Sequence, residues 1–214
     1  MAERQAVLAP QFDSLEQQRE ARTLGMWVFL ATEVLFFGGL FAGYTAYRTL
    51  YTADFAAASR HTVLWLGGPN TAVLLCSSLT MALAVRAVRL DHRRALVTCL
   101  VLTALLGATF LGLKGLEYYK DYHDHLVPGV NFVFTEADAG HAALFFLFYF
   151  FMTGLHAIHL TIAVCLVTIL AILSWRGHFA PDDYTPVELI GLFWHFVDIV
   201  WVFLLPLLYL IGRY

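Results

Sequence analysis

An imidazole and a carboxylate, His195 and Asp198, lie inside a long apolar run near the C-terminus. An ionisable side chain at the centre of a membrane-spanning helix costs roughly 2.5 to 3.5 kcal/mol on insertion scales, so such residues usually face protein or a wet cavity. The two residues are three apart, which places both on one helical face. Trp194 and Trp201 are seven apart and form a second stripe on the same helix. The sequence therefore marks His195 and Asp198 as candidate functional residues.

A third ionisable group, Glu33, lies well inside another apolar segment. About nine residues separate it from the start of that segment, a depth of roughly 14 Å in a hydrocarbon core about 30 Å thick. Glu33 could be a protonated carboxyl group that hydrogen-bonds a neighbouring helix, because burial disfavours its charged form. It could also be a proton-relay carboxylate, and the sequence leaves both interpretations open.

Two further imidazoles, His156 and His159, are expected near the centre of a fourth apolar segment, on one helical face. They could ligate haem, bind copper or iron, or belong to a hydrogen-bonded network between helices. Haem ligated by two histidines normally takes its ligands from two helices, so a haem site would need His195 as the second ligand. The network is the simplest of the three interpretations.

Lys114 and Glu117 are spaced for an ion pair on one helical face. Because Tyr118 and Tyr119 follow directly, as in an aromatic belt at a membrane interface, we expect a solvated pair at the outer end of a helix.

The composition identifies an integral membrane protein, since 60% of the 214 residues are hydrophobic and only 14% are charged. The net charge of -3 comes from no basic or acidic block, which argues against nucleic acid as a partner. Motifs for acyl or phosphoryl transfer are absent. Residues 1–22 are expected to form a polar tail and not a cleavable signal peptide, because they contain no apolar core segment. Residues 23–214 then form one membrane domain.

Five segments are long and apolar enough to cross a bilayer, so the predicted fold is an all-α transmembrane bundle of five helices. They cover residues 24–47, 70–88, 95–116, 142–173 and 187–211. The glycines and proline at residues 67–69 are expected to precede the second helix, with Asn70 or Thr71 as its cap. With the N-terminus inside, the inner segments hold eight basic residues and the outer segments four. The positive-inside rule therefore predicts that the N-terminus is inside and the C-terminus outside.

Three segments in this order and spacing closely resemble subunit III of the haem-copper respiratory oxidases. They are residues 24–33 (LGMWVFLATE), 154–161 (GLHAIHLT) and 193–201 (FWHFVDIVW), supported by residues 115–118 (GLEY). The likeness covers about nine-tenths of the chain and resembles the five-helix form, without the first two of the seven helices of the longer form. Ala157 departs from the glycine common in the family. Glu33 matches the glutamate that cytochrome c oxidases have at this position, whereas five-helix quinol oxidase relatives often have aspartate there.

This resemblance implies an accessory subunit of a terminal cytochrome c oxidase that holds no redox cofactor. Haem and copper would belong to subunits I and II, and the chain would pack on subunit I, hold phospholipid in a cleft between helices, and meet cytochrome c only indirectly. A bacterial inner (plasma) membrane is the expected location. The alternatives are a partner subunit of a quinol oxidase or nitric oxide reductase, or a small haem-binding membrane cytochrome. The intramembrane polar network would consist of Glu33, His156, His159, His195 and Asp198, with Trp27, Trp194, Trp201 and Glu117 as packing or interface residues.

Overall fold

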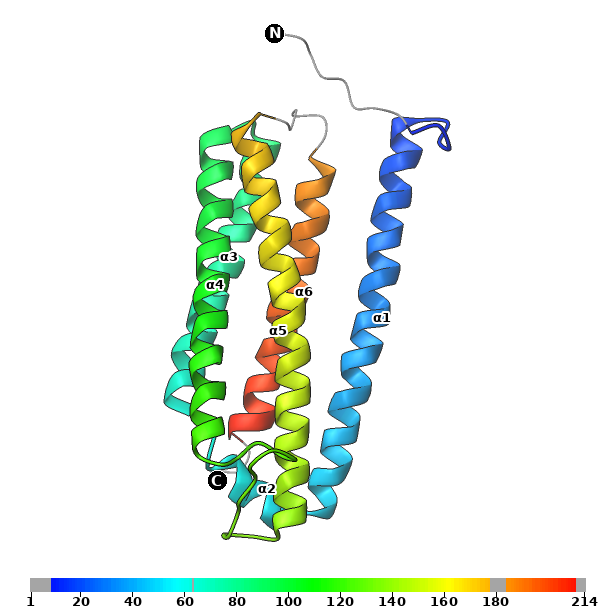
Figure 1. Ribbon diagram of the computed structural model, residues 1–214. Coiled ribbons are helices and arrows are strands. Elements are labelled where there is room, and N and C mark those ends of the chain that lie inside the picture. The colour runs from blue at the N-terminus through cyan, green and yellow to red at the C-terminus, as the bar shows by residue number, and fades with distance from the viewer. Residues whose placement is uncertain (1–8, 63, 178–183, 211–214) are drawn as a thin grey trace.

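The computed structural model describes residues 9–62, 64–177 and 184–210, and these are almost entirely helical. Five helices are long and apolar enough to cross a membrane, as the sequence predicted. The elements in chain order are α1 (Leu15–Leu50), α2 (Thr52–Ser59), α3 (Leu64–Arg89), α4 (Arg93–His123), α5 (Ala139–Trp175), α6 (Thr185–Leu205) and the π-helical segment η1 (Pro206–Leu210). The start of α1 and the end of α6 lie at opposite ends of the bundle, as an odd number of spans requires (Figure 1).

Helices α3 to α6 form a close group, and α1 stands apart from them at the end where it begins (Figure 1). Within its membrane segment α1 buries only Leu30, Phe37 and Tyr44, which are seven residues apart and so form one narrow stripe. The Tyr44 hydroxyl fixes the far end of α1 by donating to the carbonyl of Leu207, 2.9 Å away. Apart from Glu33, the other residues of this membrane segment are mainly apolar, so much of its surface can face lipid.

Helix α6 is the most buried span, with half of its most apolar window inside the protein. Trp194 and Trp201 are fully enclosed, and their indole nitrogens donate to hydroxyls on α3, to Ser77 at 3.3 Å and to Thr71 at 3.0 Å. Because an indole N–H in hydrocarbon needs an acceptor, these bonds fix how α6 is rotated against α3.

The helix ends differ from the sequence prediction. Helix α1 begins at Leu15, where the Ser14 hydroxyl caps it by accepting from the backbone of Gln17. Part of the expected polar tail is therefore helical. A helix of 36 residues is roughly 54 Å long, well over the thickness of a hydrocarbon core of about 30 Å, so polar turns continue beyond the apolar segment.

Helix α3 was also predicted to start too late. It runs from Leu64 through Gly67, Gly68 and Pro69, which the sequence analysis treated as a break. Pro69 is the sixth residue of α3, just past the first turn, so it removes one intrahelical hydrogen bond, the one to the carbonyl of Trp65, without ending the helix. Helix α4 continues to His123 instead of ending at residue 116, and α5 begins at Ala139. The predicted end of the fifth span, residue 211, lies outside the described residues.

Candidate functional site

Glu33 on α1 and His159 on α5 form a pair between helices, with Oε2 and Nε2 3.1 Å apart. The other imidazole nitrogen, Nδ1, lies 2.8 Å from the carbonyl of Leu155. A carbonyl only accepts, so Nδ1 carries a proton. Nε2 is then an acceptor from a protonated Glu33, or the pair is an imidazolium with a carboxylate. In both forms one proton is shared between the two side chains, in a site that is mostly enclosed.

His156 points to different neighbours from His159, although the sequence placed them on one face. Its ring lies between Phe110 and Trp201, with centroid distances of 5.6 and 5.1 Å. It is 1% exposed, and neither ring nitrogen has a hydrogen-bond partner among the described residues. A rotation of about 60° over three residues of a helix is enough to direct His156 towards α4 and α6 and His159 towards α1.

His195 and Asp198 both lie on the side of α6 that faces α3. The Nδ1 atom of His195 is 2.8 Å from the Ser78 hydroxyl. Asp198 lies beside the same hydroxyl and is 4% exposed, and within the described part of the chain neither carboxyl oxygen has a well-formed hydrogen bond. Ser78 therefore links the two polar residues that the sequence singled out.

Lys114 and Glu117 are not the solvated pair that we expected. Their side chains are only 5% and 2% exposed, with Nζ and Oε2 2.9 Å apart. Tyr209 donates to Glu117 Oε1 at 2.6 Å, and Tyr149 donates to the same oxygen at 2.9 Å. Lys114 also donates to the two phenol oxygens, at 2.8 and 3.3 Å.

Sequence reasoning missed both tyrosines of this buried cluster, which joins α4, α5 and η1. The signal available was Lys114 itself, because a lysine well inside an apolar helix needs partners from other helices.

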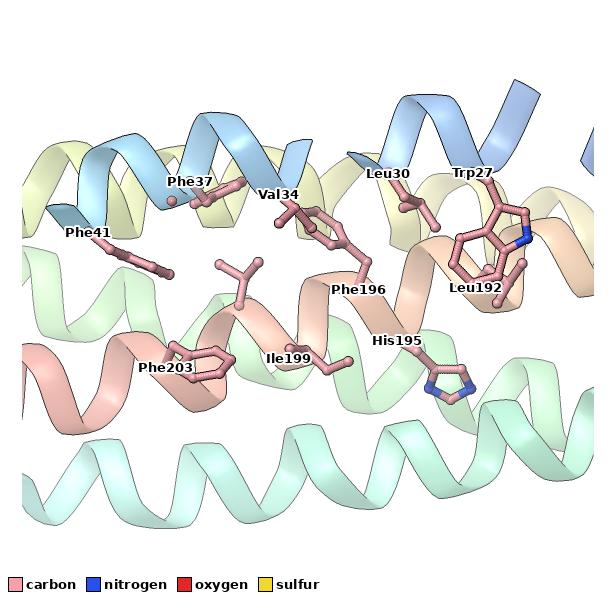
Figure 2. A pocket seen from close by; sticks show the side chains of 12 residues that line it. Trp27, Leu30, Val34, Phe37, Phe41, Leu192, His195, Phe196, Ile199 and Phe203 are labelled. Carbon is pink, nitrogen blue, oxygen red and sulfur yellow. The ribbon is translucent and has the colours of Figure 1, made fainter. Parts of the chain in front are cut away.

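A groove of about 430 Å³ runs between α1 and α6, lined almost wholly by apolar side chains (Figure 2). Trp27 and Leu30 lie along one part of its α1 wall, and Val34, Phe37 and Phe41 follow further along the helix. Trp27, predicted as a packing or interface residue, is 57% exposed and lines this groove.

The histidines do not converge on one point, because each engages a different neighbour. His159 pairs with α1, His195 with α3, and His156 lies between rings of α4 and α6. The pairing of His195 with His156 or His159 that a haem site would need is therefore not formed. In the part of the chain that the structure describes, no three metal-ligating side chains cluster.

Fold and site together define a multi-span membrane protein whose ionisable groups are paired or enclosed between helices. The family described as cytochrome c oxidase subunit III matches residues 15–213. The cytochrome c oxidase subunit 3 of Thermostichus vulcanus is 31% identical over 207 residues, covering 94% of this chain and 93% of that protein. The subunit 3 of Gadus morhua is 32% identical over 194 residues, covering 88% of this chain and 69% of the relative. The chain belongs to the cytochrome c oxidase subunit III family.

Proposed function

We propose that this chain is an accessory subunit of a terminal cytochrome c oxidase and holds no redox cofactor of its own. Subunits I and II carry the haems and copper, and the chain stabilises subunit I by packing on it. The observation that carries this proposal is that the intramembrane ionisable groups serve contacts between helices and do not converge on one site. Glu33 and His159 hold α1 against α5 and share a proton, and Lys114 and Glu117 hold the outer end together.

Deleting the chain from the oxidase tests this role. The complex without it is expected to keep its haem content per subunit I but to lose activity faster during turnover or warming. The purified chain is expected to be colourless. A haem absorption band that follows this chain alone through purification would overturn the proposal.

Phospholipid is the proposed occupant of the groove between α1 and α6. The groove is apolar along its length, as an acyl chain requires. At the end of the bundle where α1 begins, the Arg19 guanidinium lies 5.3 Å from the ring centroid of Tyr184, which places a positive charge at the end of the bundle where a headgroup would lie. Val34→Trp should fill the groove and reduce the lipid that co-purifies, as measured by mass spectrometry. Leu105→Trp, at an exposed position on α4, is the control, and equal lipid content in the two variants would contradict the assignment.

In the proposed orientation, the N-terminus lies on the inner side of a bacterial plasma membrane and the C-terminus on the outer side. The start of α1, the turn between α3 and α4 and the end of α5 lie at one end of the bundle, and most of the basic residues belong to these segments (Figure 1). Asp91→Cys in the α3–α4 turn should be protected from an impermeant thiol reagent in intact cells. Asn131→Cys in the loop before α5 should react, and the reverse pattern would invert the topology.

On this proposal, cytochrome c delivers electrons to the complex without touching the chain. Cross-linking of cytochrome c to the intact oxidase should therefore label other subunits.

A further inference from the structure

The outward face of α6 carries one polar side chain among apolar ones. Leu192, His195, Ile199 and Val202 are three or four residues apart, so they follow one stripe, which we call the α6 face. Ile199 and Val202 are 55% and 44% exposed, whereas His195 is half-buried. The stripe lies between α1 and α3, with His195 bonded to Ser78 of α3 and with Ile199 and Val202 left exposed.

The imidazole of His195 has unused hydrogen-bonding capacity. Its Nδ1 atom interacts with Ser78, and Nε2 makes no hydrogen bond to any described residue. Figure 2 shows the ring on the side of α6 away from α1. His195 lies ten residues, roughly 15 Å along the helix axis, after the start of α6 at Thr185, and seven residues, roughly 10 Å, beyond the charged Glu188. Acyl chains offer no hydrogen bond at that depth, so lipid would leave Nε2 unsatisfied.

Two grooves border the α6 face. The groove shared with α1 has a volume of about 430 Å³ and is apolar. The groove shared with α3 has a volume of about 300 Å³ and is lined by Ala82, Val85 and Gly191, and by the charged pair Arg89 and Glu188 where α3 ends and α6 begins. Leu192 and His195 line both grooves. The stripe is therefore a ridge between two grooves. Helices pack by inserting the side-chain ridges of one into the grooves of the other, so this surface suits a second helix.

The outward hydroxyls of α4 and α5 are satisfied within their own helices. Thr98 and Thr109 on α4, and Thr161 and Thr168 on α5, each donate to a carbonyl one turn earlier, at 2.7 to 2.9 Å. Lipid can cover these hydroxyls without leaving a polar group unpaired.

We propose that the α6 face docks a transmembrane helix of another oxidase subunit, which brings a hydroxyl, amide or carboxyl group to Nε2 of His195. The inference rests on the proposed function of the chain as a packed accessory subunit. Polar complementarity selects protein over lipid, because a protein helix supplies both apolar side chains for the grooves and one hydrogen-bonding group at mid-depth.

A photo-cross-linking amino acid at Ile199, incorporated in the assembled oxidase, tests the location of the interface. Leu105 on α4, which is 59% exposed, is the matched control. Irradiation is expected to join the Ile199 variant to another oxidase subunit and the Leu105 variant to lipid alone. Adducts of Ile199 with lipid only, or equal protein adducts from both positions, would overturn the inference. Failure of any oxidase subunit to co-purify with the unaltered chain would instead refute the proposed function itself.

The hydrogen bond is tested by replacing His195. His195→Phe should lower the ratio of this chain to haem in the detergent-purified complex by roughly threefold to tenfold, the effect of one interhelical hydrogen bond in a membrane. His195→Gln should restore most of the loss. Equal ratios for the wild type and His195→Phe, or no rescue by glutamine, would contradict the assigned contact. If His195→Phe fails to reach the membrane fraction, the Ile199 cross-link, made with His195 in place, decides.

Discussion

Removing Glu117 from its buried cluster should be among the most damaging single changes to the chain. The carboxylate accepts from Lys114, Tyr149 and Tyr209, at 2.9, 2.9 and 2.6 Å. Glu117→Leu leaves the ammonium group of Lys114 enclosed with the two phenol oxygens, and the nearby buried Asp121 is then the acid that remains in the cluster. Breaking a buried ion pair by removing one partner typically costs about 3 to 5 kcal/mol, so we expect a loss of that size in the free energy of unfolding.

The double variant Lys114→Met/Glu117→Leu separates the cost of an uncompensated charge from the cost of lost packing. The double variant removes both members of this ion pair and leaves Asp121 as the buried acid of the cluster, and Tyr149 and Tyr209 can still hydrogen-bond each other, since their hydroxyls are 3.3 Å apart. We expect it to be more stable than Glu117→Leu alone, because replacing a whole buried pair by apolar residues is often close to neutral. The control is Glu136→Gln, at a carboxylate that is 60% exposed and pairs with His61, where a change within about 0.5 kcal/mol is expected.

The assay is a titration of the full chain from mild detergent micelles into sodium dodecyl sulfate, followed by circular dichroism and tryptophan fluorescence. The reasoning fails if Glu117→Leu unfolds within 1 kcal/mol of the wild type, on the order of a surface change. It also fails if the losses of stability in Lys114→Met and in Glu117→Leu, each measured alone, simply add in the double variant, because residues in one network should be coupled.

Three further predictions use the same kind of measurement. Gly107→Ala should cost about 1 to 3 kcal/mol, because its Cβ would lie 2.7 Å from the enclosed ring of Trp194, whereas Gly112→Ala, with nothing within 4 Å, should be neutral or slightly stabilising. Tyr44→Phe should cost about 1 kcal/mol through loss of its hydrogen bond to η1. The pKa of Asp138, the cap of α5, lies below its usual 3.8, chiefly because the carboxylate accepts from a backbone N–H. Its stabilisation is complete above the usual value and disappears as the pH falls through the lowered one, so Asp138→Asn should make thermal stability less dependent on pH below about pH 4.

Clear results would contradict each of these three. If Gly112→Ala lost as much free energy of unfolding as Gly107→Ala, α4 would be intolerant of alanine in general and not crowded at one point. A Tyr44→Phe variant as stable as the wild type would remove the hydrogen bond as an anchor of α1. An Asp138→Asn variant with unchanged pH dependence would show that other carboxyl groups dominate acid unfolding.

The number of spans and their apolar centres could be predicted from the sequence, because hydrophobic length alone identifies a helix that crosses a bilayer. The helix ends could not. Polar residues beyond the apolar segment continue α1 back to Leu15 and α4 on to His123, where hydropathy gives no signal. Pro69 was interpreted as a break, yet α3 continues through it with the loss of one intrahelical hydrogen bond near its start.

Intramembrane polar residues were also easier to find than their partners. Glu33, His159, His195 and Asp198 are visible in the sequence because each interrupts an apolar run. Pairing depends on how helices distant in sequence are rotated against each other, and Glu33 and His159 are 126 residues apart. Lys114 was missed as the centre of a cluster because its spacing to Glu117 also fits an ordinary surface pair.

Helix α6 is the most buried of the five described spans and the last of them in chain order. The indole donors of Trp194 and Trp201 find their acceptors on α3, so α3 and α6 can pair only after α6 has been synthesised. A premature stop codon anywhere before residue 185 thus removes the central helix and not a peripheral one. Truncated products should be recognised by membrane quality-control proteases, and assembly with other subunits has to follow completion of translation.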